Sequence, residues 1–208
     1  MLNRATPVVK NIIIINALVF MAQMAFPEYE DTFLGHYPLS PGFKPWQVVT
    51  YMFMHANITH IFFNMFAVFM FGSQLERVWG SKRFLQFYML TGIGAFFIFQ
   101  FAVGVDVYNF FGSIVSEVSL GKVLGASGSV FGLLLGFGML FPNTQLMLLF
   151  PPIPIKAKYF VLGYGLIELS MAIRNQPDDN VAHLAHLGGM VFGYILIKKW
   201  QNSRTNFY

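Results

Sequence analysis

Four polar residues on three apolar segments have the side-chain types that nucleophilic catalysis requires. Ser127 stands beside glycines at the start of a long apolar run, His186 lies near the start of another, and His60 and Asn64 share a third. A serine hydroxyl is a weak nucleophile, and a neutral imidazole can activate it by accepting its proton. The oxyanion that then forms needs hydrogen-bond donors, which His60, Asn64 and the backbone N–H of Ser127 can supply. We interpret Ser127 as a candidate nucleophile, His186 as its general base, and His60 with Asn64 as oxyanion-stabilising residues.

Glycines at four-residue spacing indicate how two of these segments approach each other. The spacing occurs in the Ser127 segment and in the His186 segment, at Gly128, Gly132 and Gly136 and at Gly189 and Gly193. Small residues at this spacing let two helix backbones pack closely. We therefore expect these helices to be neighbours, with Ser127 near His186. Phe131, one turn below Ser127, is expected to pack against the imidazole and hold its orientation.

The composition is that of a membrane protein. Hydrophobic residues make up 56% of the chain and charged residues 11%, and the mean hydropathy is +0.58. The absence of cysteine excludes disulfides, thiolate metal sites and cysteine catalysis. The net charge of +4 comes from basic residues that separate apolar runs and do not cluster on a soluble face, so we expect no nucleic-acid partner.

Six apolar segments predict an all-α membrane protein, a six-transmembrane-helix bundle that forms one domain over residues 1–208. The expected spans are 8–26, 52–71, 84–103, 126–141, 159–173 and 181–197. Basic residues concentrate on one side of this arrangement, which places both termini in the cytoplasm and the loops that contain Asp106 and Asp178 outside. Spans two, four and six then run in the same direction. Their polar residues fall at a shared depth, on the order of 10 Å below the outer surface.

Acidic residues are not expected beside this cluster, so we infer a Ser–His pair without a carboxylate partner. Glu168, in the span 159–173, is an intramembrane acid and therefore a default functional candidate. It lies within two turns of Arg174, and we expect it to make a structural hydrogen bond.

Each polar residue also has a simpler interpretation. Ser127 could be a small packing residue like Ser129, and His60 with Asn64 could bridge helices by hydrogen bonds. His183 and His186 could bind a metal together with His55 or His60, but no carboxylate or thiolate completes the ligand set. We therefore expect neither a metal nor another cofactor.

At these residues the sequence resembles the rhomboid family of intramembrane serine proteases. Four stretches, in the family's order, carry the resemblance: His60 to Asn64 as His-x-x-x-Asn, Gly72 to Gly80 as Gly-x-x-x-Glu-x-x-x-Gly, Gly125 to Gly128 as Gly-x-Ser-Gly, and Ala185 to Gly189 as Ala-His-x-Gly-Gly. His55 occupies the family's earlier histidine position. One departure lies in the first loop, where the family's Trp-Arg reads Trp46-Gln47. We therefore expect this loop to be anchored differently.

The resemblance implies an endopeptidase that cleaves other transmembrane proteins in or near their membrane-spanning segments. Its partners would be those substrates and the lipid bilayer, and the bacterial inner membrane is the expected location because the chain is compact and shows no targeting extension. A catalytically inactive relative that binds membrane clients is the alternative, and it would be expected to lack Ser127 or His186. A transporter or channel would more often show paired charges in both halves of the bilayer or an internal repeat, and the sequence shows neither.

Overall fold

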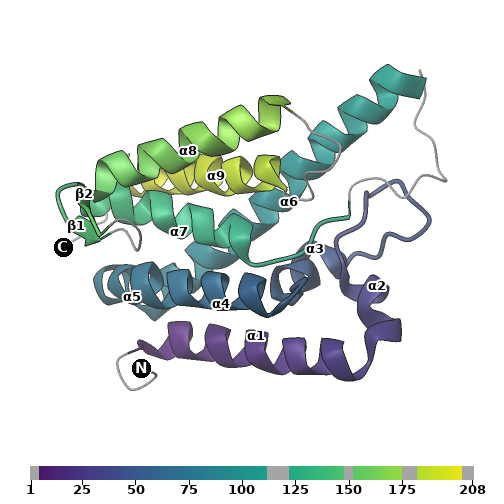
Figure 1. Ribbon diagram of the computed structural model, residues 1–208, viewed down its shortest axis with the longest axis horizontal. Helices are drawn as coiled ribbons and strands as arrows, with labels where there is room; N and C mark the ends of the chain where they lie inside the picture. The colour runs from purple at the N-terminus through teal and green to yellow at the C-terminus, as the bar shows by residue number, and fades with distance from the viewer. Residues whose placement is uncertain (1–4, 112–121, 148–151, 175–181, 203–208) are drawn as a thin grey trace.

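The computed structural model describes residues 5–111, 122–147, 152–174 and 182–202, which form long helices that lie side by side (Figure 1). The long helices are α1 (Pro7–Ala25), α4 (Ile58–Ala67), α5 (Ser73–Trp79), α6 (Ser81–Phe111), α7 (Ser127–Leu140), α8 (Ala157–Arg174) and α9 (His183–Asn202). The first turn of α1 and the last turn of α9 lie at the same end of the bundle, as does the short hairpin of β1 (Gln145–Met147) and β2 (Pro154–Lys156). The opposite end therefore holds the beginnings of α4, α7 and α9.

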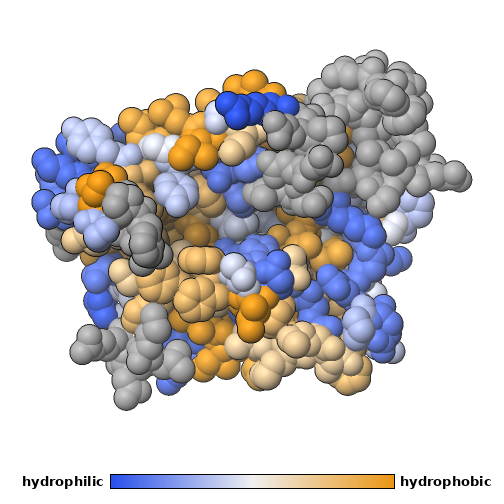
Figure 2. Space-filling view, in the orientation of Figure 1, coloured by the Kyte–Doolittle hydropathy of each residue, from blue (hydrophilic) through white to orange (hydrophobic). Residues whose placement is uncertain are grey.

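Several helices have the length and hydropathy of membrane spans. Within the described ranges, three meet both criteria: Pro7–Ala25, Ile58–Trp79 and Ser81–Gly104, while Ser127–Leu140 is apolar but shorter. Figure 2 shows hydrophobic side chains in a band between the two ends of the molecule and polar side chains mainly at the left and right ends of the view. Leu18 and Met21 of α1 are more than half exposed, which suits contact with lipid rather than water. The fold is therefore that of an all-helical membrane protein.

Some helices begin or end away from the expected spans. The segment expected to span from residue 52 starts in a 3₁₀ turn, Tyr51–Phe53, and its α-helix begins only at Ile58, where Asn57 caps it by accepting the His60 N–H at 2.9 Å. It continues through a π-turn, Val68–Gly72, into α5. The expected third span ended at residue 103, but α6 extends to Phe111, so Asp106 lies on a helix. Asp178 is outside the described residues.

Glycine contacts hold α7 against α9. A Cβ on Gly189 would lie 1.8 Å from the carbonyl oxygen of Gly128, and one on Gly193 would lie 3.4 Å from Cα of Gly132. The two backbones are therefore in direct contact, as the glycine spacing predicts. On its other side, Gly128 packs against Ala95 of α6, where an added Cβ would approach the alanine methyl to 2.5 Å. Helix α7 thus lies between α6 and α9 with no room for side chains at these points.

The buried Gln47 organises the loop between α1 and α4. Its Oε1 accepts the N–H groups of Lys44 and His36, at 3.0 and 3.4 Å, and its Nε2 donates to the carbonyls of Thr32 and Gly42, both at 3.2 Å. All four bonds join backbone groups of one irregular segment, which includes α2 (Glu30–Phe33) and α3 (Gln47–Thr50). The position where the family has arginine is therefore filled by a neutral amide whose donors and acceptor are all used.

Further contacts tie this loop to the segment that precedes α7. Gly35 and Val123 form an antiparallel bridge with N···O distances of 2.8 and 2.9 Å. Lys122 forms an ion pair with Asp31, and its hydrogen bond and charge hold the pKa of that carboxyl below its usual value. The loop and the approach to Ser127 are therefore built as one unit.

The buried Glu76 of α5 anchors the N-terminus of α1. Its carboxylate accepts the backbone N–H groups of Val8 and Val9, each at 3.0 Å, as well as the hydroxyls of Thr6 and Ser81. The first N–H groups of a helix have no partner within the helix, and a negative charge there is stabilising. Glu76 is thus a structural carboxylate that caps α1.

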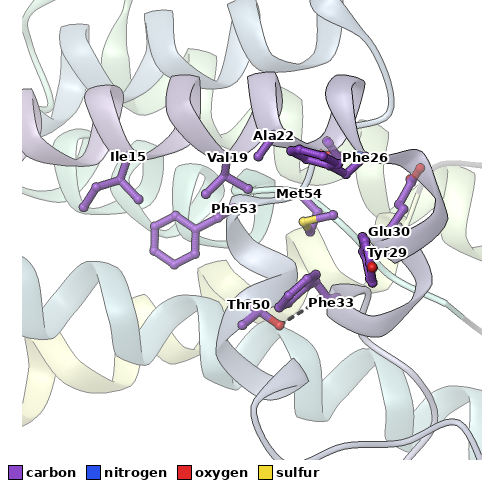
Figure 3. Close-up of a pocket in the computed structure, with 11 residues that line it drawn as sticks. Ile15, Val19, Ala22, Phe26, Tyr29, Glu30, Phe33, Thr50, Phe53 and Met54 are labelled. Carbon is purple, nitrogen blue, oxygen red and sulfur yellow. Dashed lines mark hydrogen bonds between the residues drawn. The ribbon is translucent and has the colours of Figure 1, made fainter.

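A large apolar cavity lies between α1 and the loop that follows it (Figure 3). Its volume is about 580 Å³, and its walls include Ile15, Val19, Phe33 and Phe53. The four candidate catalytic residues do not line it. The candidate site therefore lies outside this cavity.

The contact between Gly128 and Gly189 predicts a strong dependence of stability on side-chain size. Gly189→Leu should lower the melting temperature in detergent, because overpacking usually costs about 1–3 kcal/mol and here the clash is with backbone. Gly163→Leu on α8 is the matched control, since a Cβ there meets nothing within 4 Å. Equal melting temperatures for Gly189→Leu and the wild type would show that α7 and α9 do not require this contact.

Candidate active site

Ser127 is the first residue of α7, and the residues before it fix its position. Gly125 has φ +115°, a conformation that favours glycine, and its N–H donates to the Tyr51 carbonyl at 2.8 Å. A Cβ at Gly125 would lie 2.9 Å from Nε2 of His60 and 3.7 Å from Oγ of Ser127. Glycine is therefore required both by the backbone and by the histidine beside it. The N–H groups of this first helical turn, among them that of Ser127, have no acceptor within the helix.

The structure brings Ser127 and His186 into hydrogen-bond contact. Oγ of Ser127 lies 2.8 Å from Nε2 of His186, which is in the first turn of α9 and is buried. The Phe131 ring stacks on the imidazole, with centroids 4.3 Å apart and planes 9° from parallel. The histidine ring is thus held on its face by Phe131 and at one edge by Ser127.

The expectation that no carboxylate meets this pair is wrong. Oε2 of Glu168, from α8, lies 2.8 Å from Nδ1 of His186. The reason is topological: α8 and α9 are consecutive, packed helices whose connection runs only from residue 175 to 182. Glu168 and His186 are each a turn or two from that connection, so they reach the same depth. In the sequence, the signal for this contact is that Glu168 and His186 lie at similar distances from the short connection between the two helices.

This carboxylate defines the protonation pattern of His186. An ionised carboxylate only accepts hydrogen bonds, so the Nδ1 that faces it carries the ring proton. The neutral ring then has a lone pair on Nε2, directed at the Ser127 hydroxyl. Ser127 donates to Nε2, and Nδ1–H donates to Glu168. This is the arrangement in which an imidazole can take the proton of a serine.

His183 shares the same carboxylate oxygen. Its Nδ1 lies 2.6 Å from Oε2 of Glu168, and it precedes His186 by three residues on α9. The three side chains also present ligand atoms within 4.8 Å of one another, as a metal site would. Two ligands at 2.0–2.1 Å from a tetrahedral zinc ion, however, lie roughly 3.3 Å apart. The observed distances of 2.6 and 2.8 Å are those of hydrogen bonds, so the donor set fits shared protons better than a metal.

His60 lies beside the turn that precedes Ser127 and faces Gly125. Its Nδ1 accepts the Ala56 N–H at 3.4 Å, so the ring proton of neutral His60 is on Nε2. Nε2 also lies close to Gly125, 2.9 Å from the position that a Cβ there would take. His60 therefore presents an N–H donor near Ser127, as an oxyanion site requires.

Asn64 and His55 support His60 from two directions. Asn64 is buried, and its Nδ2 donates to the His60 carbonyl at 3.1 Å, which leaves the second N–H of that amide for another acceptor. The ring of His55 meets that of His60 edge to face, with centroids 5.0 Å apart. The backbone of His55 is clamped by the Gln23 side chain, through two hydrogen bonds of 3.0 Å.

Ser129, two residues after Ser127, has a different environment. Its hydroxyl is buried and donates to the Tyr88 carbonyl on α6 at 2.7 Å. This is the helix-bridging role that a serine usually has in a membrane protein. Ser127 differs because its partner is an imidazole nitrogen rather than a backbone carbonyl. The arrangement at Ser127 has the geometry that acyl transfer requires: a hydroxyl bonded to an imidazole, a carboxylate behind that imidazole, and a second histidine beside the same loop.

Comparisons with known proteins show which family this chain resembles. The Rhomboid domain family matches residues 42–200, a range that contains all four candidate catalytic residues. The chain is 26% identical over 201 residues to the Rhomboid protease AarA of Providencia stuartii, covering 89% of this chain and 69% of that protein. It is 28% identical over 198 residues to the Putative rhomboid protease YdcA of Bacillus subtilis, covering 93% and 88%. RHOMBOID-like protein 6, mitochondrial, of Arabidopsis thaliana is 30% identical over 170 residues, and the match covers 80% of this chain and 48% of that protein.

The contrast between Ser127 and Ser129 predicts selective reactivity. A fluorophosphonate reagent should label the folded protein at Ser127, because its hydroxyl contacts an imidazole base, whereas that of Ser129 donates to a backbone carbonyl. Ser127→Ala should abolish labelling, and Ser129→Ala should keep it while lowering the melting temperature through loss of the Tyr88 bond. Mass spectrometry of the labelled peptide locates the adduct. Labelling that survives in Ser127→Ala would assign the nucleophile elsewhere.

Proposed function

The chain belongs to the rhomboid family of membrane serine proteases, and from this premise we propose that it is an active intramembrane endopeptidase. The observation that carries the proposal is the 2.8 Å contact between Ser127 Oγ and His186 Nε2. An inactive relative would have no need to preserve that contact at the end of a buried helix. The substrates we propose are other transmembrane proteins, cut in or near their membrane-spanning segments.

Ser127 is the proposed nucleophile and His186 the proposed general base. His186 takes the hydroxyl proton as Oγ attacks the scissile carbonyl, and returns a proton to the leaving amine as the acyl-enzyme forms. Water then hydrolyses the acyl-enzyme with the same base. Gly125 and Gly128 serve this chemistry indirectly, since the first fixes the turn before Ser127 and the second lets α9 bring His186 close.

We propose that the oxyanion is stabilised by three kinds of donor. They are the Nε2–H of His60, the free N–H of the Asn64 amide and the backbone N–H of Ser127. The proposal is supported by two bonds: the Ala56 N–H orients the His60 ring, and the His60 carbonyl holds the Asn64 amide. Donors that are fixed before the reaction stabilise developing charge without reorganisation.

We further propose one domain with six membrane spans and both termini in the cytoplasm. The proposal is supported by the charge distribution and by the position of the α1 start and the α9 end at the same end of the bundle. Helices α7, α8 and α9 would be the last three spans, and Ser127 would then lie in the outer half of the bilayer. We propose a bacterial inner membrane as the location, supported by the large share of the two bacterial relatives that the chain covers.

A cleavage assay tests the proposed protease activity. The wild type in liposomes should cut a transmembrane substrate that has helix-destabilising residues near the site, because a helical peptide bond is already hydrogen-bonded and shielded. Ser127→Ala and His186→Ala should each abolish the cut, and the double variant should be no worse than either, because the two residues act as one unit. Cleavage by folded Ser127→Ala would refute the serine mechanism.

The same assay separates the oxyanion donors from the pair that exchanges the proton. His60→Ala and Asn64→Ala should each lower kcat by about 10²–10³-fold, the usual cost of losing one such donor. Their KM values should change little, since the donors act on charge that appears in the transition state. Wild-type rates in both variants would leave these residues with a structural role alone.

The proposed orientation can be tested with single cysteines, because the chain has none of its own. A membrane-impermeant maleimide added to intact cells should label a cysteine at Lys44, in the loop between α1 and α4, and should not label one at Lys156, in β2. The two sites are both lysines near helix ends, so they are matched in chemistry. The reverse pattern would invert the chain and place Ser127 towards the cytoplasm.

A further inference from the structure

We infer that Glu168 is a positioning residue that acts through His186, holding the ring in the tautomer and orientation that can accept the Ser127 proton. For its effect on rate this inference rests on the proposed protease function. The tautomer itself can be measured whether or not the protein is active. Four side chains then form one continuous series of hydrogen bonds: Ser127, His186, Glu168 and His183.

Glu168 forms a direct hydrogen bond with His186, the proposed base. Oε2 of Glu168 is 2.8 Å from Nδ1 of His186, and the two side chains are each 10% exposed. On the opposite edge of the same ring, Nε2 is 2.8 Å from Ser127 Oγ. A ring bonded at both nitrogens and stacked on Phe131 has one orientation available. Its tautomer follows from the charge of the group that faces Nδ1.

His183 explains how the carboxylate keeps its own position. The side chain of Glu168 has three rotatable bonds and would otherwise sample several rotamers. Oε2 accepts from Nδ1 of both histidines, at 2.6 and 2.8 Å, so the oxygen is fixed by two donors from one helix. Because His183 and His186 are one turn apart on α9, both can reach the same atom. His183 therefore fixes the Glu168 carboxylate, which in turn orients the His186 ring.

A purely structural role would not require a carboxylate at this place. The other buried residues of α8 are Ala157 and Val161, about three and two turns before Glu168, and both are apolar. An apolar side chain could pack α8 against α9 without the cost of removing a charge from water. A carboxylate that faces the imidazole of the catalytic serine can instead stabilise the imidazolium that forms when His186 takes the proton.

The kinetic test compares two buried carboxylates in the full-length protein. Glu168→Gln should lower kcat for a transmembrane substrate by about 10²–10⁴-fold, the range expected when the group behind a catalytic histidine loses its charge. KM should change by less than about threefold, because Glu168 does not touch the substrate. Glu76→Gln is the matched control: it weakens the anchor of α1 and should lower the melting temperature with kcat retained. Glu168→Asp should recover part of kcat, since it restores the charge on a shorter side chain.

The spectroscopic test reads the tautomer directly. Histidine imidazole ¹⁵N shifts in detergent micelles distinguish Nδ1–H from Nε2–H, and the chain has 5 histidines, so the His186 signals can be assigned by their loss in His186→Gln. The wild type should show His186 protonated at Nδ1, and Glu168→Gln should shift the population towards Nε2–H. This result would support the inference even if no substrate were cleaved, which separates it from the proposed function.

Two results would overturn the inference. One is a wild-type His186 that carries its proton on Nε2 at neutral pH. The other is a folded Glu168→Gln with wild-type kcat, which would reduce Glu168 to a contact between α8 and α9. If Glu168→Gln does not fold, the wild-type tautomer and the kcat of Glu168→Asp still decide the question.

Discussion

The structure depends on the direct contact between the backbones of α7 and α9. Gly189 leaves no space for a methyl group beside the Gly128 carbonyl, so the two helices approach as closely as peptide backbones can. In a bilayer the lipid tails are as apolar as the side chains, and close packing of this kind is a main source of helix association. The same contact sets the distance between the first turns of the two helices. Ser127 and His186 occupy those turns, and they are in contact because Gly128 and Gly189, the glycines near them, are in contact.

Among the buried polar side chains of the described residues, the carboxylates of Glu76 and Glu168 each have several hydrogen-bond partners. Glu76 and Glu168 are both carboxylates on apolar helices, but their surroundings differ. Glu76 accepts backbone N–H and hydroxyl groups at the start of α1, which is a capping interaction. Within the part of the chain that the structure describes, the groups that donate to Glu168 are imidazole N–H groups, one of which belongs to the ring that contacts Ser127. The identity of the donors, rather than burial, separates an anchoring carboxylate from one proposed to act in the site.

The loop before α4 prepares the other half of the site. Gln23 clamps the backbone of His55, the His55 ring meets the His60 ring, and the Ala56 N–H fixes which nitrogen of His60 carries the proton. Gln47 holds the outer part of the same loop through four bonds to backbone groups. These contacts are local in space but come from α1, the loop and α4. They make the position of the His60 donor a property of the fold rather than of one helix.

The sequence by itself determined the membrane character, the glycine spacing and the four candidate catalytic residues, because these depend on residue type and on periodicity along one segment. It also indicated that Phe131 packs on His186, since residues one turn apart share a helix face. Only the tertiary structure decided that Glu168 reaches His186, that His183 shares its oxygen, and that Gln47 satisfies a position where the family has arginine. The physical reason is that hydrogen bonds between elements depend on where two helices stand relative to each other to within about half an ångström. A sequence pattern predicts how deep a residue lies in the membrane and which face of its helix it occupies. It does not predict the distance between two helices with that precision.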